Sequence, residues 1–214
     1  MPEEIALPFR GIYWDDAQEQ LPWVRAAYLL GHARVEYALK DHVCGQSLSL
    51  KALTDIHGVL FGGVWPEFAG KLRGPAPQYL PVQISFGKYR AVPLEQVPGQ
   101  CAQLFDTLSG LIAQLDEMKN DVSIDDFQGE IFKVASYVHC ELIRIHPFVN
   151  GNGRTSRMCI NYFAWRYGFV PVSYDRPGDA TEYLAANGTW LEKKRIDHFV
   201  SLLRSWCQEE ASAK

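Results

Sequence analysis

Apolar residues recur at the three- and four-residue spacing of amphipathic helices over most of the chain. Ser123 and Asp126 resemble a capping box at the start of one such stretch, with Asp in place of the usual Glu. The pattern predicts helices at roughly 18–40, 49–61, 99–118, 124–145, 153–167, 179–187 and 191–209. The hydrophobic pattern therefore predicts a mostly α-helical single domain.

The pattern changes between 62 and 98, where repeated prolines and glycines interrupt any helical period. Within this stretch the segments LPVQISF and YRAVPL flank Gly87 and Lys88, and a glycine in so short a connection favours a tight turn. We therefore predict one short β-hairpin at about 80–94. Lys88, at its tip, either contacts a target or keeps an exposed strand edge soluble.

Composition and charge narrow the functional classes. The 214 residues are enough for one core, and 47% hydrophobic with 21% charged residues is typical of a soluble globular protein. A net charge of −4 argues against a nucleic-acid binder, which usually carries a basic face. Without an apolar run of about 18 residues or a basic, apolar leader, we expect no membrane association and a cytoplasmic location, with a translocated effector as the open alternative.

Five cysteines without a C-x-x-C pair are interpreted as buried, reduced thiols: Cys44, Cys101, Cys140, Cys159 and Cys207.

The strongest chemical signal is the stretch ELIRIHPFVNGNGRTSRMCINYF, in which a glycine-rich turn joins two predicted helices. Gly151 and Gly153 allow backbone conformations and close approaches that side chains would block. The N–H groups of such a turn, followed at once by a helix start, form a concave anion site. Arg154 and Arg157 share one face of the first turn of that helix, where cations oppose the helix dipole unless an anion offsets them. The turn is therefore predicted to bind an anion.

His146 stands at the end of the helix before this turn. An unperturbed pKa of about 6.5 leaves its ring mostly neutral at pH 7 and able to take a proton from a hydroxyl group. Asn152 can donate and accept, so it binds either a phosphate oxygen or a neighbouring backbone group. Phe148 is expected to anchor the loop in the core. His139 lies two turns before His146, but no Cys or carboxylate cluster accompanies it, so we expect a core histidine and not a metal ligand.

The string HPFVNGNGRTSR, at 146–157, resembles the signature of the Fic family, H-P-F-x-[D/E]-G-N-G-R-x-x-R, and departs from it at Asn150. IHGVLFGGVWPEFAGKLR is similar to the segment that leads to the flap in Fic and Doc proteins, and the predicted hairpin lies where the family has that flap. DATEYLAANGTW resembles a later helix that helps to line the nucleotide pocket. The resemblance covers about 48–204 and implies a Fic-type helical domain, with 1–47 as a helical extension packed on it and 205–214 as a tail.

This resemblance implies a protein adenylyltransferase, which transfers AMP from ATP to a serine, threonine or tyrosine hydroxyl of a target protein. His146 would be the general base, and the flap, with Gly87 and Lys88 at its turn, would pair with the target backbone as an added strand. In the Doc branch a lysine takes the place of Gly153, so glycine favours AMP transfer over a Doc-like protein phosphotransferase. The nucleotide- and phosphate-binding residues implied are Asn150, Gly151, Asn152, Gly153, Arg154 and Arg157.

Asn150 stands where the family usually has Asp or Glu to hold Mg²⁺ on the phosphates. Mg²⁺ prefers a charged oxygen ligand, and an amide oxygen is a weaker one, so we expect ATP as co-substrate with a weakly held Mg²⁺. Three alternatives stay open: an active enzyme that depends less on Mg²⁺, an enzyme that uses another donor, and a degenerate nucleotide-binding module with little activity.

Many Fic proteins carry an inhibitory helix with the pattern [S/T]-x-x-x-E-[G/N]. The spacing occurs here from Ser205 to Glu209, and Glu210 follows in place of Gly or Asn. The inhibitor is then a degenerate C-terminal segment, a separate small antitoxin-like protein, or absent, and the last two alternatives are favoured.

Overall fold

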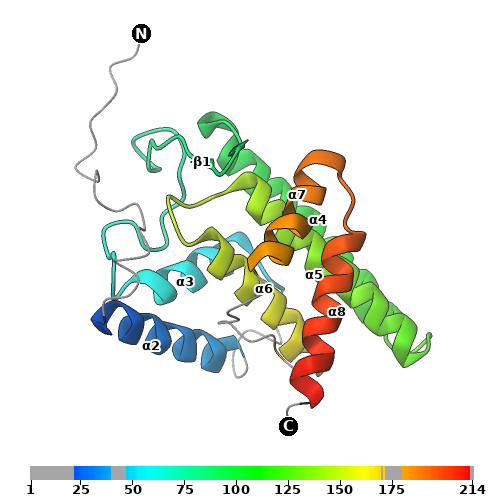
Figure 1. The fold of residues 1–214 in the computed structure, drawn as a ribbon. Coiled ribbons are helices and arrows are strands. Elements are labelled where there is room, and N and C mark those ends of the chain that lie inside the picture. The colour runs from blue at the N-terminus through cyan, green and yellow to red at the C-terminus, as the bar shows by residue number, and fades with distance from the viewer. Residues whose placement is uncertain (1–21, 40–46, 170, 172–179, 213–214) are drawn as a thin grey trace.

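The computed structural model describes residues 22–39, 47–169, 171 and 180–212. In this part of the chain, seven α-helices accompany one two-stranded hairpin (Figure 1). The α-helices are α2 (Pro22–Ala38), α3 (Leu50–Phe61), α4 (Val97–Met118), α5 (Ile124–Ile145), α6 (Asn152–Tyr167), α7 (Ala180–Lys193) and α8 (Asp197–Ser212). The hairpin consists of β1 (Ser85–Phe86) and β2 (Tyr89–Arg90), and the 3₁₀ turn η2 (Leu94–Gln96) follows it. The predicted mostly α-helical fold with one short hairpin is confirmed.

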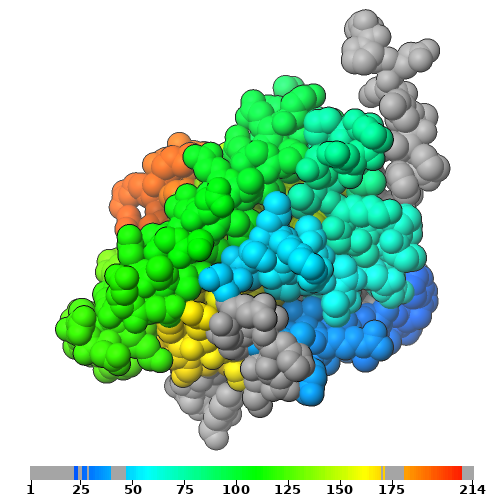
Figure 2. Space-filling view, turned by 180° about the vertical axis from the view of Figure 1, so that it is seen from behind, coloured from blue at the N-terminus to red at the C-terminus, as the bar shows by residue number. Residues whose placement is uncertain are grey.

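Helix α5 is the centre of the fold and packs against α4, α6, α7 and α8. Its buried side chains extend from Phe127 in the first turn to Ile145 in the last, so one apolar stripe supplies contacts to all four neighbours. Helix α2 packs against α3, which also contacts α4 and α6. Figure 2 shows α4, α3 and α2 side by side on the back of the molecule. The helix that ends at the predicted active-site loop is therefore held on several sides.

Side chains at the helix starts satisfy backbone donors that have no partner inside the helix. Ser49 Oγ accepts a hydrogen bond from the N–H of Ala52 at the start of α3. Ser123 Oγ accepts from the N–H of Asp126 and donates to Asp126 Oδ2 at 2.7 Å. The predicted capping pair therefore forms, although Asp126 bonds to the serine hydroxyl and not, as in a full capping box, to its backbone N–H.

The paired strands of the hairpin are shorter than the two segments that the sequence indicated. The paired residues are Ser85 with Arg90 and Phe86 with Tyr89. Gly87 has a φ of +55°, which suits the first position of a two-residue hairpin turn. Leu80, by contrast, bonds to the segment before the hairpin: its N–H donates to Leu72 and its carbonyl accepts from Gly74. A competing backbone partner therefore limits the length of the hairpin.

The break between the last two helices lies at 194–196, and the prediction of a break at 188–190 is wrong. Gly188 lies inside α7, where an added Cβ would come within 3.0 Å of the Tyr89 hydroxyl. The missing side chain thus makes room for the hairpin and does not end the helix. Lys194 ends it instead, with a φ of +55° and its N–H bonded to the carbonyl of Trp190.

Helix α8 continues to Ser212, so it includes Ser205, Glu209 and the boundary expected after residue 204. The division into an extension, a Fic-type domain and a tail stays a prediction, and residues 1–21 lie outside the described part. None of the described helices has the combination of length and apolar character needed to cross a bilayer. Cys44 also lies outside the described part; the cysteines found free there are Cys101, Cys140, Cys159 and Cys207.

Candidate active site

His146 lies directly after the last residue of α5 and adopts a left-handed backbone conformation with φ 55°. Its N–H donates to the carbonyl of Leu142, and its ring stacks on Phe86 of β1 with the centroids 4.2 Å apart. In Figure 1 the hairpin and the connection from α5 to α6 lie on the same side of the molecule. The hairpin therefore supplies one wall of the His146 site.

The His146 ring is oriented as a proton acceptor. Nδ1 lies 3.1 Å from the carbonyl oxygen of Ile143, and a carbonyl can only accept, so Nδ1 carries the proton in this contact. The lone pair of the neutral ring is then on Nε2. Burial lowers the pKa of His146 to about 4, although the Ile143 carbonyl raises it, and the charge of Arg73 lowers it further. The ring is therefore neutral near pH 7, which is the form that accepts a proton.

The glycine loop after His146 has the backbone shape that the sequence indicated. Gly151 has a φ of +77°, and an added Cβ would lie 2.3 Å from Cζ of the buried Phe61. The Asn152 side chain accepts from the N–H of Phe148 and donates to the carbonyl of the same residue, each at 2.9 Å. Of the two roles that the sequence left open for Asn152, it performs the backbone one here and closes the loop.

His57 on α3 holds the loop from the other side, a role that no motif in the sequence indicated. Its Nδ1 accepts from the N–H of Gly70 at 2.8 Å, so Nε2 carries the proton and donates to the carbonyl of Asn150 at 3.0 Å. The ring is 1% exposed and stacks on Phe148 with a centroid distance of 3.8 Å. The segment that resembles the flap-leading stretch contains this histidine, but only the fold shows that it reaches residue 150.

The first turn of α6 combines open backbone donors with two cations. The N–H groups of a helix's first turn have no acceptor inside the helix, and the capping residue Gly151 has no side chain to provide one. Arg154 lies over the ring of Phe61 and Arg157 over the ring of Tyr183, with 5.1 and 5.4 Å between the guanidinium carbon and the ring centroid. An added Cβ on Gly153 would lie 3.6 Å from Nη1 of Arg157, so a side chain at residue 153 would occupy the space beside this cation. The geometry suits a polyphosphate.

Asn150 does not form a metal site with its described neighbours. Its side-chain oxygen accepts from the N–H of Gly151 at 2.6 Å. Within the described residues, no cluster of three or more His, Cys, Asp or Glu side chains is placed to hold a metal ion. A single amide oxygen is a poor donor set for Mg²⁺, which usually takes one or two carboxylates from a protein. The described residues therefore provide no carboxylate beside Asn150 for Mg²⁺, and the weak Mg²⁺ site at Asn150 stays a prediction.

The turn of the hairpin is tied to α7. Lys88 Nζ lies 2.5 Å from Glu192 Oε1, and the Tyr89 hydroxyl donates to the same oxygen at 2.8 Å. These are exposed contacts, which usually contribute little to stability. They join the turn of the hairpin to α7, while Phe86 of the same hairpin stacks on His146. Whether Gly87 and Lys88 contact a target stays a prediction.

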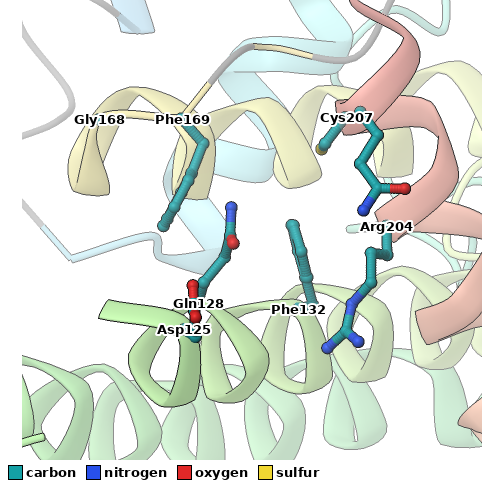
Figure 3. A pocket seen from close by; sticks show the side chains of 8 residues that line it. Asp125, Gln128, Phe132, Gly168, Phe169, Arg204 and Cys207 are labelled. Carbon is teal, nitrogen blue, oxygen red and sulfur yellow. The ribbon is translucent and has the colours of Figure 1, made fainter. Parts of the chain in front are cut away.

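His139 is a core residue, and it lies near enough to Arg157 for that charge to lower its pKa, after the larger effect of burial. It is 0% exposed and stacks on Phe199 of α8, with a centroid distance of 4.3 Å. A cavity of about 520 Å³ lies elsewhere, between α5, the end of α6 and α8 (Figure 3). It includes Asp125 and Phe132 from the first half of α5, whereas His146 follows the other end of a 22-residue helix that is about 33 Å long. We therefore do not assign this cavity to the candidate active site.

Mild acid is expected to destabilise the fold through its buried histidines. Burial lowers the pKa of His57 to about 4 and that of His139 to about 3, from 6.5. Below pH 6.5 these histidines are protonated in the unfolded chain but stay neutral in the native state. The free energy of unfolding is therefore highest above pH 6.5 and falls toward pH 4, by about 1.4 kcal/mol per pH unit for each histidine. Urea denaturation at pH 7.5, 6 and 5 measures the slope. His139→Phe should flatten it, and equal stability at pH 7.5 and 5 would contradict the expectation.

Comparison with known proteins identifies a family. Residues 47–164 match the family model described as the Fic/DOC family. The protein adenylyltransferase fic-1 of Caenorhabditis briggsae is 31% identical over 133 residues, which are 62% of this chain and 22% of the relative. The protein adenylyltransferase Fic of Drosophila pseudoobscura pseudoobscura is 53% identical over 38 residues, 18% of this chain and 8% of the relative. The chain thus spans about a fifth or less of the length of these curated relatives.

Solved structures share the fold. Fic-1 from C. elegans superposes with a TM-score of 0.64 at 22% identity, over 87% of this chain and 49% of that one. The BepC protein of Bartonella tribocorum, solved with bound AMPPNP, superposes with a TM-score of 0.58 at 18% identity, over 86% of this chain and 87% of that one. At these identities the likeness concerns the arrangement of the helices and the hairpin.

Proposed function

Because the chain belongs to the Fic/DOC family, we propose that it transfers AMP from ATP to a serine, threonine or tyrosine hydroxyl of a target protein. The observation that carries the proposal is the placement of a neutral His146, with its lone pair on Nε2, next to a helix start that carries Arg154 and Arg157. A base and an anion site on the two sides of one loop are the parts that transfer from a nucleotide to a hydroxyl requires. That the curated relatives are named adenylyltransferases supports the choice of AMP as the transferred group.

In the proposed reaction, Nε2 of His146 takes the proton of the target hydroxyl as its oxygen attacks the α-phosphorus of ATP. The bond between the α-phosphorus and the oxygen that bridges to the β-phosphate breaks, and pyrophosphate leaves with the bonding electron pair. Arg154 and Arg157 offset the charge that grows on the leaving group, and the N–H groups at the start of α6 orient the phosphates. In this scheme the stacking on Phe86 fixes the plane of the His146 ring and so the direction of Nε2 toward the target hydroxyl.

The residues that hold the loop have a different role from those that bind phosphate. Asn152 and His57 bond to the loop backbone, at Phe148 and Asn150, and so preserve the concave shape of the turn. Gly151 leaves room for the Phe61 ring beneath the loop, and Gly153 leaves the space beside Arg157 open. We therefore assign direct phosphate contacts to the backbone at 151–153 and to the two arginine side chains.

Labelled ATP tests this proposal. The protein is incubated with ATP labelled at the α-phosphate, and separately at the γ-phosphate, in a lysate that supplies target hydroxyl groups. Label from the α position alone is the expected result. Label from the γ position alone would replace AMP transfer by phosphoryl transfer, as in the Doc-like alternative. Protein that binds ATP but transfers neither label, in bacterial and eukaryotic lysates alike, would support the degenerate nucleotide-binding module that Asn150 favours.

Asn150→Asp is expected to lower the Mg²⁺ concentration that gives a half-maximal rate of AMP transfer by about tenfold, because it supplies the charged oxygen that Mg²⁺ prefers. An aspartate oxygen can still accept from the N–H of Gly151, so the loop should keep its shape. The rate is measured over a Mg²⁺ series at saturating ATP. Asn120→Asp adds the same charge at an exposed turn and serves as the control. An unchanged Mg²⁺ dependence in Asn150→Asp would show that residue 150 does not face the metal.

The proposed partners are an ATP molecule and a target protein whose backbone pairs with the hairpin edge. A separate inhibitor protein remains part of the proposal and follows from the resemblance to the family alone. We propose no nucleic-acid or membrane partner, and a cytoplasmic location stays a prediction.

A further inference from the structure

Arg73 is a fully buried cation, with 0% of its surface exposed, in the segment that leads to the hairpin. Its Nη2 donates to the carbonyl of Ile145 at 2.7 Å and to that of Val92 at 2.9 Å. Its Nε donates to the carbonyl of His146, and its backbone N–H donates to the carbonyl of Pro147 at 2.8 Å. One residue thus binds the end of α5, the candidate base itself and the segment after β2.

Two of these carbonyls belong to the end of a helix. The last carbonyls of an α-helix have no intrahelical donor, and the negative end of the helix dipole favours a cation there. Arg73 satisfies the carbonyls of Ile145 and His146, while the ring of His146 donates to the carbonyl of Ile143. The C-terminal end of α5 is therefore capped twice, by the side chain of Arg73 from another segment and by the ring of His146, the candidate base. The two caps therefore act on neighbouring carbonyls of the same helix end.

The bond to Val92 extends this arrangement to the hairpin. Val92 is 7% exposed and follows β2, and Phe86 of β1 stacks on the His146 ring. Arg73 thus fixes the backbone of His146 and, through Val92, the hairpin that carries the opposite wall of the ring. The distance between the ring and the hairpin edge depends on both contacts.

Stability alone does not account for a buried arginine in this place. Its hydrogen-bond partners in the described part of the chain are carbonyl groups, and Nη1 has none there. Burial lowers the pKa of Arg73 to about 10, so the side chain stays charged at pH 7 and the desolvation of that charge opposes folding. A buried cation without a carboxylate lowers stability unless its hydrogen bonds compensate, and an apolar side chain avoids this cost. We therefore attribute the guanidinium at this position to its geometry, since its rigid set of donors holds several carbonyl groups in one arrangement.

We propose that Arg73 is a positioning residue that holds His146 and the hairpin in the relative orientation required for proton transfer from the target hydroxyl. This proposal rests on the proposed function, because it names the residue that orders the base of that reaction. Arg73 does not touch ATP or the hydroxyl in this scheme. It acts through the carbonyls of residues 145, 146 and 92.

Arg73→Lys separates position from charge. A lysine ammonium can take the place of Nη2 between Ile145 and Val92, but lysine has no second nitrogen at the position of Nε, so the bond to the His146 carbonyl is lost. Arg73→Met removes the charge as well as every donor. Arg166→Lys is the matched control, because Arg166 is also shielded, with 16% exposure, but pairs with Asp116 at 2.6 Å away from the loop.

The experiment measures the rate of AMP transfer at saturating ATP, the half-saturating ATP concentration and the NMR titration of the His146 ring in each folded variant. Arg73→Lys should lower the saturated rate by about 10- to 100-fold, as a displacement of about 1 Å does, with half-saturation changed less than about threefold. Arg166→Lys should keep the wild-type rate. Arg73→Met should raise the pKa of His146, because it removes a positive charge that lowers this pKa. Arg73→Lys keeps the charge, so it should leave the pKa unchanged but shift the ring signals. The other groups that contact the ring, Phe86 and Ile143, bring no charge.

A saturated rate of Arg73→Lys within about threefold of wild type would overturn the proposal. A lower rate in Arg73→Lys with unchanged chemical shifts of the His146 ring would also overturn it, because the effect would then not pass through His146. If the wild-type protein transfers no AMP, the proposed function fails and the NMR titration decides the role of Arg73 alone. Unchanged chemical shifts of the His146 ring in Arg73→Lys would then end the positioning role, and changed shifts with an unchanged pKa would support it.

Discussion

His146→Asn is expected to lower the rate of AMP transfer by about 10³-fold, within the range that a general base contributes to a proton transfer. The substitution removes Nε2 as the proton acceptor but leaves the phosphate-binding loop intact. Asparagine tolerates the left-handed backbone conformation, φ 55°, that residue 146 adopts, so the end of α5 should keep its shape. Alanine at the same position should lose as much activity and some stability in addition, because it tolerates this conformation less well.

Two measurements distinguish the loss of the general base from the loss of the ATP-binding site. Transfer from α-labelled ATP gives the rate, and calorimetric titration with a non-hydrolysable ATP analogue gives the dissociation constant, which should change less than about threefold. His198→Asn on α8, where the histidine lies near the Thr189 hydroxyl, is the control and should keep the wild-type rate. A His146→Asn protein that retains a tenth or more of the wild-type rate would exclude His146 as the base.

Gly151→Ala is expected to destabilise the protein by about 2–4 kcal/mol, through the strain of a left-handed alanine and the overpacking of a full core. The new Cβ would lie 2.3 Å from Cζ and 2.4 Å from Cε2 of Phe61, a fully buried side chain, so either the ring or the loop would have to shift. The same ring carries Arg154 on its face, so a shift of Phe61 would move a phosphate-binding cation. ATP should therefore bind about tenfold more weakly or worse in the protein that remains folded.

Gly110→Ala provides a control of opposite sign. Gly110 lies within α4, an added Cβ meets nothing within 4 Å, and alanine is favoured over glycine in a helix by about 1 kcal/mol. Urea denaturation should thus show a more stable Gly110→Ala protein with unchanged affinity for the ATP analogue. If Gly151→Ala instead kept the wild-type stability and affinity, the contact of the loop with Phe61 would not be essential to its shape.

The catalytic loop shows how far local sequence determines a site. The glycines at 151 and 153 and the arginines at 154 and 157 predict an anion-binding turn by themselves, because backbone conformation and helix dipoles act over a few residues. The structure keeps these residues together at the start of α6. Asn152 is different, since its donor and acceptor suit a phosphate or a backbone equally well. In the folded protein the side-chain amide of Asn152 bonds to the backbone of Phe148.

His57 and Arg73 show what local sequence does not determine. Their contacts with the loop join residues 93 and 73 positions apart, as in the bonds from His57 to Asn150 and from Arg73 to His146. No spacing rule relates such positions, because the packing of α3 and of the segment before the hairpin against α5 and α6 brings them together. The short strands of the hairpin have the same cause, since Leu80 pairs with residues 72 and 74 in place of extending the hairpin.

The sequence by itself determined a mostly α-helical fold, a hairpin with its turn at Gly87 and a loop suited to phosphate, because helical periodicity, turn chemistry and cation placement are local properties. Only the tertiary structure decided which side chains hold that loop, how the hairpin meets the His146 ring and which nitrogen of that ring carries the lone pair. These features depend on burial and on contacts between distant segments, and both arise only when the core has formed.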